Sequence, residues 1–328
     1  MGDLFSLAAT EAEGRRRQML RTAFGPAIAA ALADPGVIEV MVNPDGRLWL
    51  DKAGSGRVDT GAQLGAAEAE RIIRLVAAHV HREVHDGAPI VSAELPETGE
   101  RFEGLIPPLA TAPCFSIRKP AGVIYSLADY VAAGIASPRQ ADTLRAAVAD
   151  RKSIVVVGGT SSGKTTLVNA LLAEIAGLDE RVIILEDTRE LNCAAKDCVA
   201  LRTRPGVASL ADLVRSTLRL RPDRIIVGEV RGREALDMLK AWNTGHPGGI
   251  TTIHANSALS ALYRLEQLVQ EAVITVPRDL IVEAVDLVVF LSGRGAKRRI
   301  ETVAEVVDLD HHGDYVLKPL GPPALHAV

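Results

Sequence analysis

Residues 153–176 read SIVVVGGTSSGKTTLVNALLAEIA and carry the clearest structural signal in the chain. The segment opens with β-branched residues, passes through a glycine-rich turn of the pattern G-x4-G-K-[ST], and continues as a helical pattern. A strand, a glycine-rich loop and a helix in this order form a P-loop, in which backbone N–H groups and the helix N-terminus bind phosphate. A glycine-rich turn with a chance lysine would lack both flanks, so the sequence predicts a nucleotide site.

The residues expected to contact the nucleotide are consecutive. They are Gly158, Gly159, Thr160, Ser161, Ser162, Gly163, Lys164, Thr165 and Thr166. Lys164 is expected to reach the β- and γ-phosphates of ATP, and the Thr165 hydroxyl is expected to bind Mg²⁺. Two later strands end in acids, Glu186-Asp187 and Glu229. Since parallel sheets bind ligands at the carboxyl ends of their strands, Glu229 or Asp187 is expected to contribute to the metal site. A solvated strand end is the alternative interpretation for each acid.

Uninterrupted β-branched runs indicate a parallel sheet in the second part of the chain. They lie at residues 153–159, 181–187, 223–230, 249–255 and 286–293, with helical patterns between several of them. Strands that are apolar throughout are buried on both faces, which is typical of a sheet covered by helices. We therefore predict an α/β protein whose residues 137–328 form a RecA-like P-loop ATPase domain, with edge strands at 299–310 and 314–320.

A different pattern precedes this domain. Helical spacing over residues 11–33 and 66–85 alternates with short strand patterns at 37–43, 47–51, 89–95, 101–108 and 114–120. Residues 1–136 are therefore predicted to form an N-terminal α+β domain with a mostly antiparallel sheet and a linker. On the second helix, His81 and His85 would share a face at i,i+4 spacing. We interpret them as part of a polar face, because no metal-binding motif accompanies them.

Composition excludes several classes of protein. The 328 residues suggest two domains, and the net charge of −4 with 3% aromatic residues argues against nucleic-acid binding. Three cysteines at unpaired spacing form neither a disulfide framework nor a zinc motif, which favours a reducing cytoplasm. No apolar run reaches the ~20 residues that span a bilayer.

Four motifs occur in a specific order along residues 158–256. They are the P-loop GGTSSGKTT, an acidic box IILEDTREL, a Walker B-like RPDRIIVGEVRG and a histidine box TGHPGGITTIHAN. Together with GERFEGLIPPLATAPCFSIRKPAG in the N-terminal part, they resemble the ATPase superfamily that drives type II and type IV secretion and pilus dynamics. The resemblance runs from about residue 36 to 293 and is strongest to the conjugal-transfer branch.

The resemblance implies roles for particular residues. Glu186 falls at the acidic-box glutamate that prepares the attacking water, and Glu229 at the Walker B glutamate. His246 and His254 fall at positions that sense the γ-phosphate and link it to the neighbouring subunit. From the residues alone, a core position is the alternative for His254, and an exposed turn is the alternative for His246.

The resemblance also implies an assembly. Arg101 and Arg118 fall at arginines that clamp phosphates at a domain and subunit boundary, and a basic strand end on the surface is the alternative interpretation for Arg118. Members form homo-hexameric rings on the cytoplasmic face of the inner membrane. They associate peripherally with it through inner-membrane secretion components, and no direct contact with nucleic acid is expected.

The sequence leaves four functions open. The leading one is Mg²⁺-dependent ATP hydrolysis by a hexameric motor of a conjugative type IV secretion system. A pilus retraction or assembly ATPase is the close alternative, and a RecA-like nucleic-acid motor is disfavoured by charge and aromatic content. A non-catalytic nucleotide-binding scaffold is disfavoured because Lys164, Thr165, Glu186 and Glu229 are all present.

Overall fold

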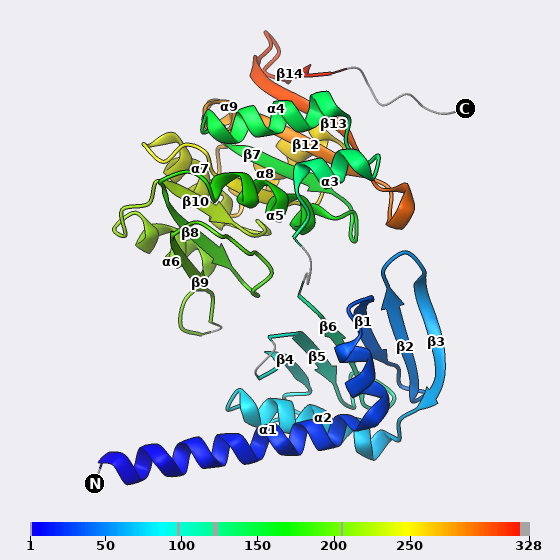
Figure 1. The fold of residues 1–328 in the computed structure, drawn as a ribbon. Helices are drawn as coiled ribbons and strands as arrows, with labels where there is room; N and C mark the ends of the chain where they lie inside the picture. Colours follow the sequence, from blue (N-terminus) through cyan, green and yellow to red (C-terminus); the bar gives the residue numbers. More distant parts are fainter. Residues whose placement is uncertain (1, 97–98, 121–123, 205, 322–328) are drawn as a thin grey trace. The chain divides into compact units, whose positions relative to one another are not determined.

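The computed structural model describes residues 2–96, 99–120, 124–204 and 206–321 and divides into two units, Met1–Gly122 and Val123–Val328 (Figure 1). The division lies earlier than the boundary expected after residue 136. Helix α3 (Leu127–Ala132) belongs to the second unit, because Leu127 and Tyr130 are buried in its core. Residues 322–328 of the expected second domain lie outside the described residues.

The first unit is an α+β domain, as predicted, and the strand pairs of its sheet are all antiparallel. The strand order is β3-β2-β1-β6-β5-β4. The strands are β1 (Val37–Val42), β2 (Arg47–Lys52), β3 (Gly56–Gln63), β4 (Ile90–Glu94), β5 (Arg101–Leu105) and β6 (Cys114–Arg118). Helices α1 (Gly2–Ala33) and α2 (Ala66–His79) share one apolar core with the sheet. β3 escaped prediction because nearly all its side chains are exposed, so no alternation marks it.

The expected helix over residues 66–85 is shorter in the structure. α2 ends at His79, His81 has a left-handed φ of 56°, and His85 forms a bridge with Ala88. The prediction that His81 and His85 share a helix face was therefore wrong. No group of three or more His, Cys, Asp or Glu side chains in the described part of the chain is arranged to hold a metal.

The second unit contains one eight-stranded sheet in the order β14-β13-β12-β7-β11-β10-β8-β9 (Figure 1). Its parallel strands are β7 (Ile154–Gly158), β8 (Arg181–Glu186), β9 (Asp197–Arg202), β10 (Arg224–Val227), β11 (Ile250–Ile253) and β12 (Leu287–Ser292). At one side of the sheet, β13 (Arg299–Leu309) pairs antiparallel with β12 and with the edge strand β14 (Tyr315–Pro319). The sequence predicted all of these except β9, whose side chains are half exposed.

Helices cover both faces of this sheet, which confirms the predicted three-layer arrangement. They are α3, α4 (Pro138–Ala149), α5 (Lys164–Ile175), α6 (Leu210–Thr217), α7 (Glu234–Asn243), α8 (Ala258–Gln270) and α9 (Arg278–Ala284). Alternate residues of β7 face opposite cores. Ile154 and Val156 pack in the core with α3, α4 and α5, whereas Val155 and Val157 pack with α6 to α9. β7 is therefore fixed from both sides, and its carboxyl end presents the loop that follows.

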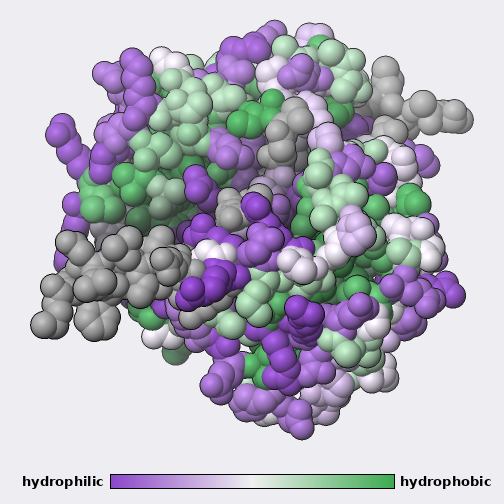
Figure 2. All heavy atoms as spheres, turned by 60° about the horizontal axis from the view of Figure 1, so that its bottom comes forward, coloured by the Kyte–Doolittle hydropathy of each residue, from purple (hydrophilic) through white to green (hydrophobic). Residues whose placement is uncertain are grey.

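No helix among the described residues is long and apolar enough to cross a membrane. The face shown in Figure 2 mixes hydrophilic and hydrophobic side chains, and neither kind covers it alone.

Candidate active site

The glycine-rich turn has the predicted strand–loop–helix geometry. β7 ends at Gly158, and α5 begins at Lys164. A Cβ at Gly158 would lie 2.5 Å from Ser162 Oγ, and Gly163 has a φ of 93°, so both positions require glycine. The turn therefore brings consecutive backbone groups around one point in front of the α5 N-terminus, where helix geometry favours an anion.

Lys164 is folded over this turn. Its side chain is nearly buried, and Nζ donates to the carbonyl oxygens of Gly158 at 3.0 Å and Gly159 at 3.1 Å. Nζ also lies 3.3 Å from Nδ1 of His254, which follows β11. The ammonium group is thus held at the mouth of the P-loop by weak neutral acceptors, which a phosphate oxygen can replace.

Glu229 lies between the imidazole of His254 and the guanidinium of Arg231. His254 Nε2 lies 3.0 Å from Glu229 Oε1, and Arg231 donates to Glu229 Oε2. Burial, followed by the charge of Lys164, lowers the pKa of His254, so this imidazole is neutral at neutral pH. The chain Lys164–His254–Glu229–Arg231 links the P-loop to the ends of β10 and β11. The sequence analysis did not identify Arg231, although it lies two residues after Glu229 in the Walker B-like motif.

Glu186 is buried, with 4% of its surface exposed, and its contacts are with backbone. Its Oε1 accepts the N–H groups of Glu190 and Leu191, each at 2.9 Å. Burial raises the pKa of Glu186 to about 7 against the opposing effect of these two N–H donors. The carboxylate therefore holds the segment after β8 in place.

Glu190 is the acid that this segment presents to the P-loop. The Thr165 hydroxyl donates to Glu190 Oε2 at 3.2 Å, and Asn169 Nδ2 donates to the Glu190 carbonyl at 3.3 Å. Sequence reasoning missed Glu190, although it lies four residues after Glu186 in the acidic box. Asp187, one of the two acids proposed for the metal, instead accepts a hydrogen bond from Thr203 at 2.8 Å.

The two histidines of the histidine box do not meet in one site. His254 follows the carboxyl end of β11, whereas His246 precedes its amino end, with Nδ1 3.0 Å from the carbonyl of Pro222. A four-residue strand separates them, which is about 10 Å or more of extended chain. His246 therefore lies away from the P-loop of its own unit, because it is at the amino end of β11 and the P-loop is at the carboxyl ends of the parallel strands.

Arg101 and Arg118 are cross-strand neighbours in the first unit. They are paired in register between β5 and β6, and Arg118 also pairs with Glu39 on β1. Their strand neighbours Phe102 and Ile117 are fully buried on the opposite face, so both arginines lie on the face away from the core. The structure thus brings the two together, and their action on phosphate stays a prediction.

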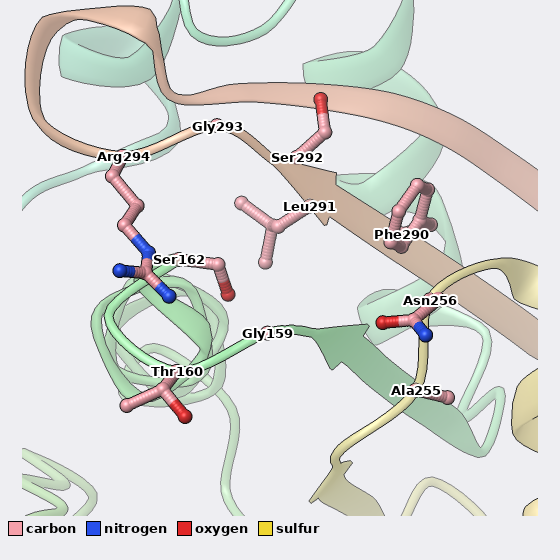
Figure 3. A pocket seen from close by; sticks show the side chains of 10 residues that line it. All are labelled: Gly159, Thr160, Ser162, Ala255, Asn256, Phe290, Leu291, Ser292, Gly293 and Arg294. Atoms are coloured by element: carbon pink, nitrogen blue, oxygen red, sulfur yellow. The ribbon is translucent and has the colours of Figure 1, made fainter.

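A cavity lies beside the P-loop, between the carboxyl end of β12 and the segment after β11 (Figure 3). It is lined by Gly159, Thr160, Ser162, Ala255, Asn256, Phe290, Leu291, Ser292, Gly293 and Arg294. The Arg294 side chain reaches from the end of β12 toward the P-loop at Thr160 and Ser162 (Figure 3). The lining combines the apolar side chains of Phe290 and Leu291 with polar groups beside a phosphate loop, which suits the nucleoside part of a nucleotide.

Comparison with known proteins agrees with this site. Residues 27–297 match the family model described as type II/IV secretion system protein. The chain is 50% identical over 289 residues to the conjugal transfer protein TrbB of Rhizobium radiobacter, covering 88% of this chain and 89% of that protein. It is 32% identical over 285 residues to the type IV secretion system protein VirB11 of Bartonella henselae, covering 75% and 80%.

Solved structures show the same fold. The pilus retraction motor PilT with bound ADP has a TM-score of 0.61 at 18% identity, with 91% of this chain and 83% of that chain covered. The ATPase DotB of Legionella pneumophila has a TM-score of 0.56 at 20% identity, with 87% and 76% covered.

A P-loop whose lysine, threonine and two nearby carboxylates gather at the carboxyl edge of a parallel sheet defines an ATP-hydrolysing enzyme. The chain belongs to the type II/IV secretion system protein family, and its ATPase activity agrees with that membership.

Proposed function

We propose that this ATPase forms a hexameric ring that powers a conjugative type IV secretion system. Relatives that are 50% and 47% identical over 88% of the chain carry conjugal-transfer names, which supports conjugation over pilus retraction. The likeness to the pilus retraction motor, at 18% identity, concerns the fold alone. The ring would act at the cytoplasmic face of the inner membrane, held there by secretion components.

The observation that carries the catalytic part is the contact between Thr165 and Glu190 beside Lys164. A hydroxyl and a carboxylate oxygen are ligands of the kind that Mg²⁺ prefers, so these residues fit the ion. Bound there, Mg²⁺ would neutralise charge on the β- and γ-phosphates. Lys164 exchanges its carbonyl partners for phosphate oxygens, and Glu186 keeps Glu190 in position through its backbone contacts.

Glu229 is the second acid, and it orients the attacking water. Arg231 donates to one of its carboxylate oxygens, and the His254 ring lies 3.0 Å from the other, so Glu229 is already in contact with both side chains before nucleotide arrives. His254 contacts both Glu229 and Lys164, which makes it the link between the phosphate position and the water position. A pre-arranged donor and acceptor set of this kind lowers the barrier without reorganisation.

Arg101 and Arg118 supply positive charge to the γ-phosphate from a neighbouring subunit in this proposal. Both lie on the face of their sheet opposite the apolar core, and this is the face that would meet the neighbouring subunit. An arginine supplied in trans is worth roughly 10³–10⁵ in rate. Hydrolysis then depends on assembly of the ring.

The secretion role is tested in donor cells that lack the gene and are complemented with wild type or Glu229→Gln. Loss of plasmid transfer, restored by wild type and not by Glu229→Gln, is expected. Intact transfer with lost pilus retraction would instead assign the chain to the pilus alternative. Strong stimulation of purified ATPase by DNA would favour a nucleic-acid motor.

A further inference from the structure

Arg298 lies against the P-loop from outside. It follows the 3₁₀ turn η1 (Gly295–Lys297) in the connection between β12 and β13. A Cβ at Gly163 would lie 2.7 Å from both Cζ and Nε of Arg298, so the guanidinium occupies the space that any other residue at 163 would need. Glycine at position 163 is therefore needed for two reasons: it allows the left-handed backbone conformation, and it leaves room for the Arg298 guanidinium.

The guanidinium also contacts the loop by its polar edge. Arg298 Nη2 donates to the Ser161 carbonyl at 3.4 Å, a long hydrogen bond. Its Nε is buried and has no hydrogen-bond partner among the described residues. The positive charge of Arg298 thus lies beside Ser161 and Gly163, and Gly163 immediately precedes Lys164. The Nε–H group of Arg298 is a donor that is still without an acceptor among the described residues.

The connection that carries Arg298 is fastened to the segment after the first unit. Ile300 N donates to the Ile135 carbonyl at 2.7 Å, and Gln140 Nε2 donates to the Ile300 carbonyl at 3.1 Å. On α3, burial raises the pKa of the Tyr130 phenol, while the charge of Arg298 acts to lower it. Arg298 therefore lies between the P-loop and the segment formed by α3 and α4.

We propose that Arg298 is a positioning residue of the phosphate site, which clamps the Ser161–Gly163 turn so that its N–H groups stay directed at the phosphates. A carbonyl of the loop bound by Arg298 on the outer side cannot rotate inward, where it would repel an anion. The planar guanidinium of Arg298 packs on Gly163 and so restrains the turn by its shape as well as by its charge. A lysine ammonium group would supply the charge without the planar shape.

This role predicts an effect on nucleotide binding rather than on the chemical step. The clamp acts equally on ATP and ADP, because both place phosphates in the loop. Loss of a charged hydrogen bond and of the packing beneath it weakens binding by about tenfold or more. KM then rises while kcat changes little, which is the pattern of lost uniform binding.

The experiment compares wild type with Arg298→Ala, Arg298→Lys and the matched control Arg299→Ala. Arg299 is the next residue, is exposed and pairs with Ser292 between β12 and β13. Affinities for fluorescent ATP and ADP analogues, KM, kcat and thermal midpoints are measured, and methylguanidinium is added to Arg298→Ala. The full-length chain is used throughout.

Arg298→Ala is expected to lose about tenfold in affinity for both nucleotides. Arg298→Lys recovers only part of it, methylguanidinium restores Arg298→Ala, and Arg299→Ala behaves as wild type. Nucleotide affinity of Arg298→Ala within twofold of wild type, whether or not its thermal midpoint falls, overturns the proposal. Full recovery in Arg298→Lys also overturns it, because a point charge would then suffice. If Arg298→Ala does not fold, the affinity of Arg298→Lys decides by the same criterion.

Discussion

The carboxylate of Glu190 accepts a hydrogen bond from the hydroxyl of Thr165, 25 residues earlier in the chain, at 3.2 Å. Glu186 makes this contact possible, because its own carboxylate holds the backbone of Glu190 and Leu191. The two glutamates of the acidic box thus have different contacts. Glu186 supports the segment after β8, and Glu190 faces the P-loop helix α5.

Glu190→Gln is expected to lower turnover by roughly 10² or more and to weaken the Mg²⁺ dependence of activity, since a charged oxygen ligand is lost at Thr165. Steady-state ATPase rates against Mg²⁺ concentration, together with Mn²⁺ binding followed by electron paramagnetic resonance, measure both effects. Asp142→Asn serves as the control, because this acid has 75% of its side chain exposed on α4. Unchanged Mn²⁺ affinity in Glu190→Gln would contradict the assignment.

Glu186→Gln is expected to flatten the pH dependence of stability. The pKa of Glu186 is raised to about 7 in the folded protein, so the folded state binds more protons than the unfolded state between about pH 4.5 and 7. Wild-type stability contributed by this group is present at low pH and falls as pH rises through 7, by about 3 kcal/mol in total.

Thermal midpoints from pH 5 to 8 test this directly. The thermal midpoint of Glu186→Gln minus that of wild type should increase by several degrees from pH 5 to pH 8. A constant difference introduced by the amide does not affect this change. Asp142→Asn should follow the wild-type curve. A difference between Glu186→Gln and wild type that does not change with pH would show that Glu186 is not protonated in this window.

Glu229→Gln keeps the shape of the side chain and removes its charge. It is expected to bind ATP with nearly wild-type affinity and to hydrolyse it at least about 10² times more slowly, because the water loses its acceptor. Filter binding and single-turnover hydrolysis separate the two properties. Loss of ATP binding by a folded Glu229→Gln protein would instead place Glu229 in the support of the metal.

The P-loop was predictable because it is local. Strand, turn and helix follow each other without a break, and each carries its own pattern, from β-branched residues to Gly163 to the apolar helix. Most strands of the two sheets were predictable for a similar reason, because each carries its own local pattern of apolar residues. β3 and β9 were not, because nearly all side chains of β3 and half of those of β9 are exposed, and only pairing with β2 and β8 makes them strands.

The division of roles in the site could not be predicted. Glu186 and Glu190 are both acids of one box, and which of them is buried depends on how the segment after β8 turns back over α5. His246 and His254 are close in sequence, but they lie at opposite ends of β11, one before its amino end and one after its carboxyl end. Arg298 has no motif of its own, and only its packing on Gly163 reveals it.

In the proposed ring, each site is completed by an arginine of the neighbouring subunit. Lys164→Ala lacks the charge that binds the β- and γ-phosphates, and Arg118→Ala lacks the charge supplied in trans. Each variant alone is expected to be nearly inactive, although Arg118→Ala should still bind ATP.

The most direct measurement is the ATPase rate of the two inactive variants mixed and reassembled into rings. Sites that combine the P-loop of an Arg118→Ala subunit with the arginine of a Lys164→Ala subunit are intact, so activity should return to a sizeable fraction of wild type. Specific activity of wild type should also rise with protein concentration. A mixture as inactive as its components, or an Arg118→Ala protein that hydrolyses ATP at the wild-type rate, would contradict the account.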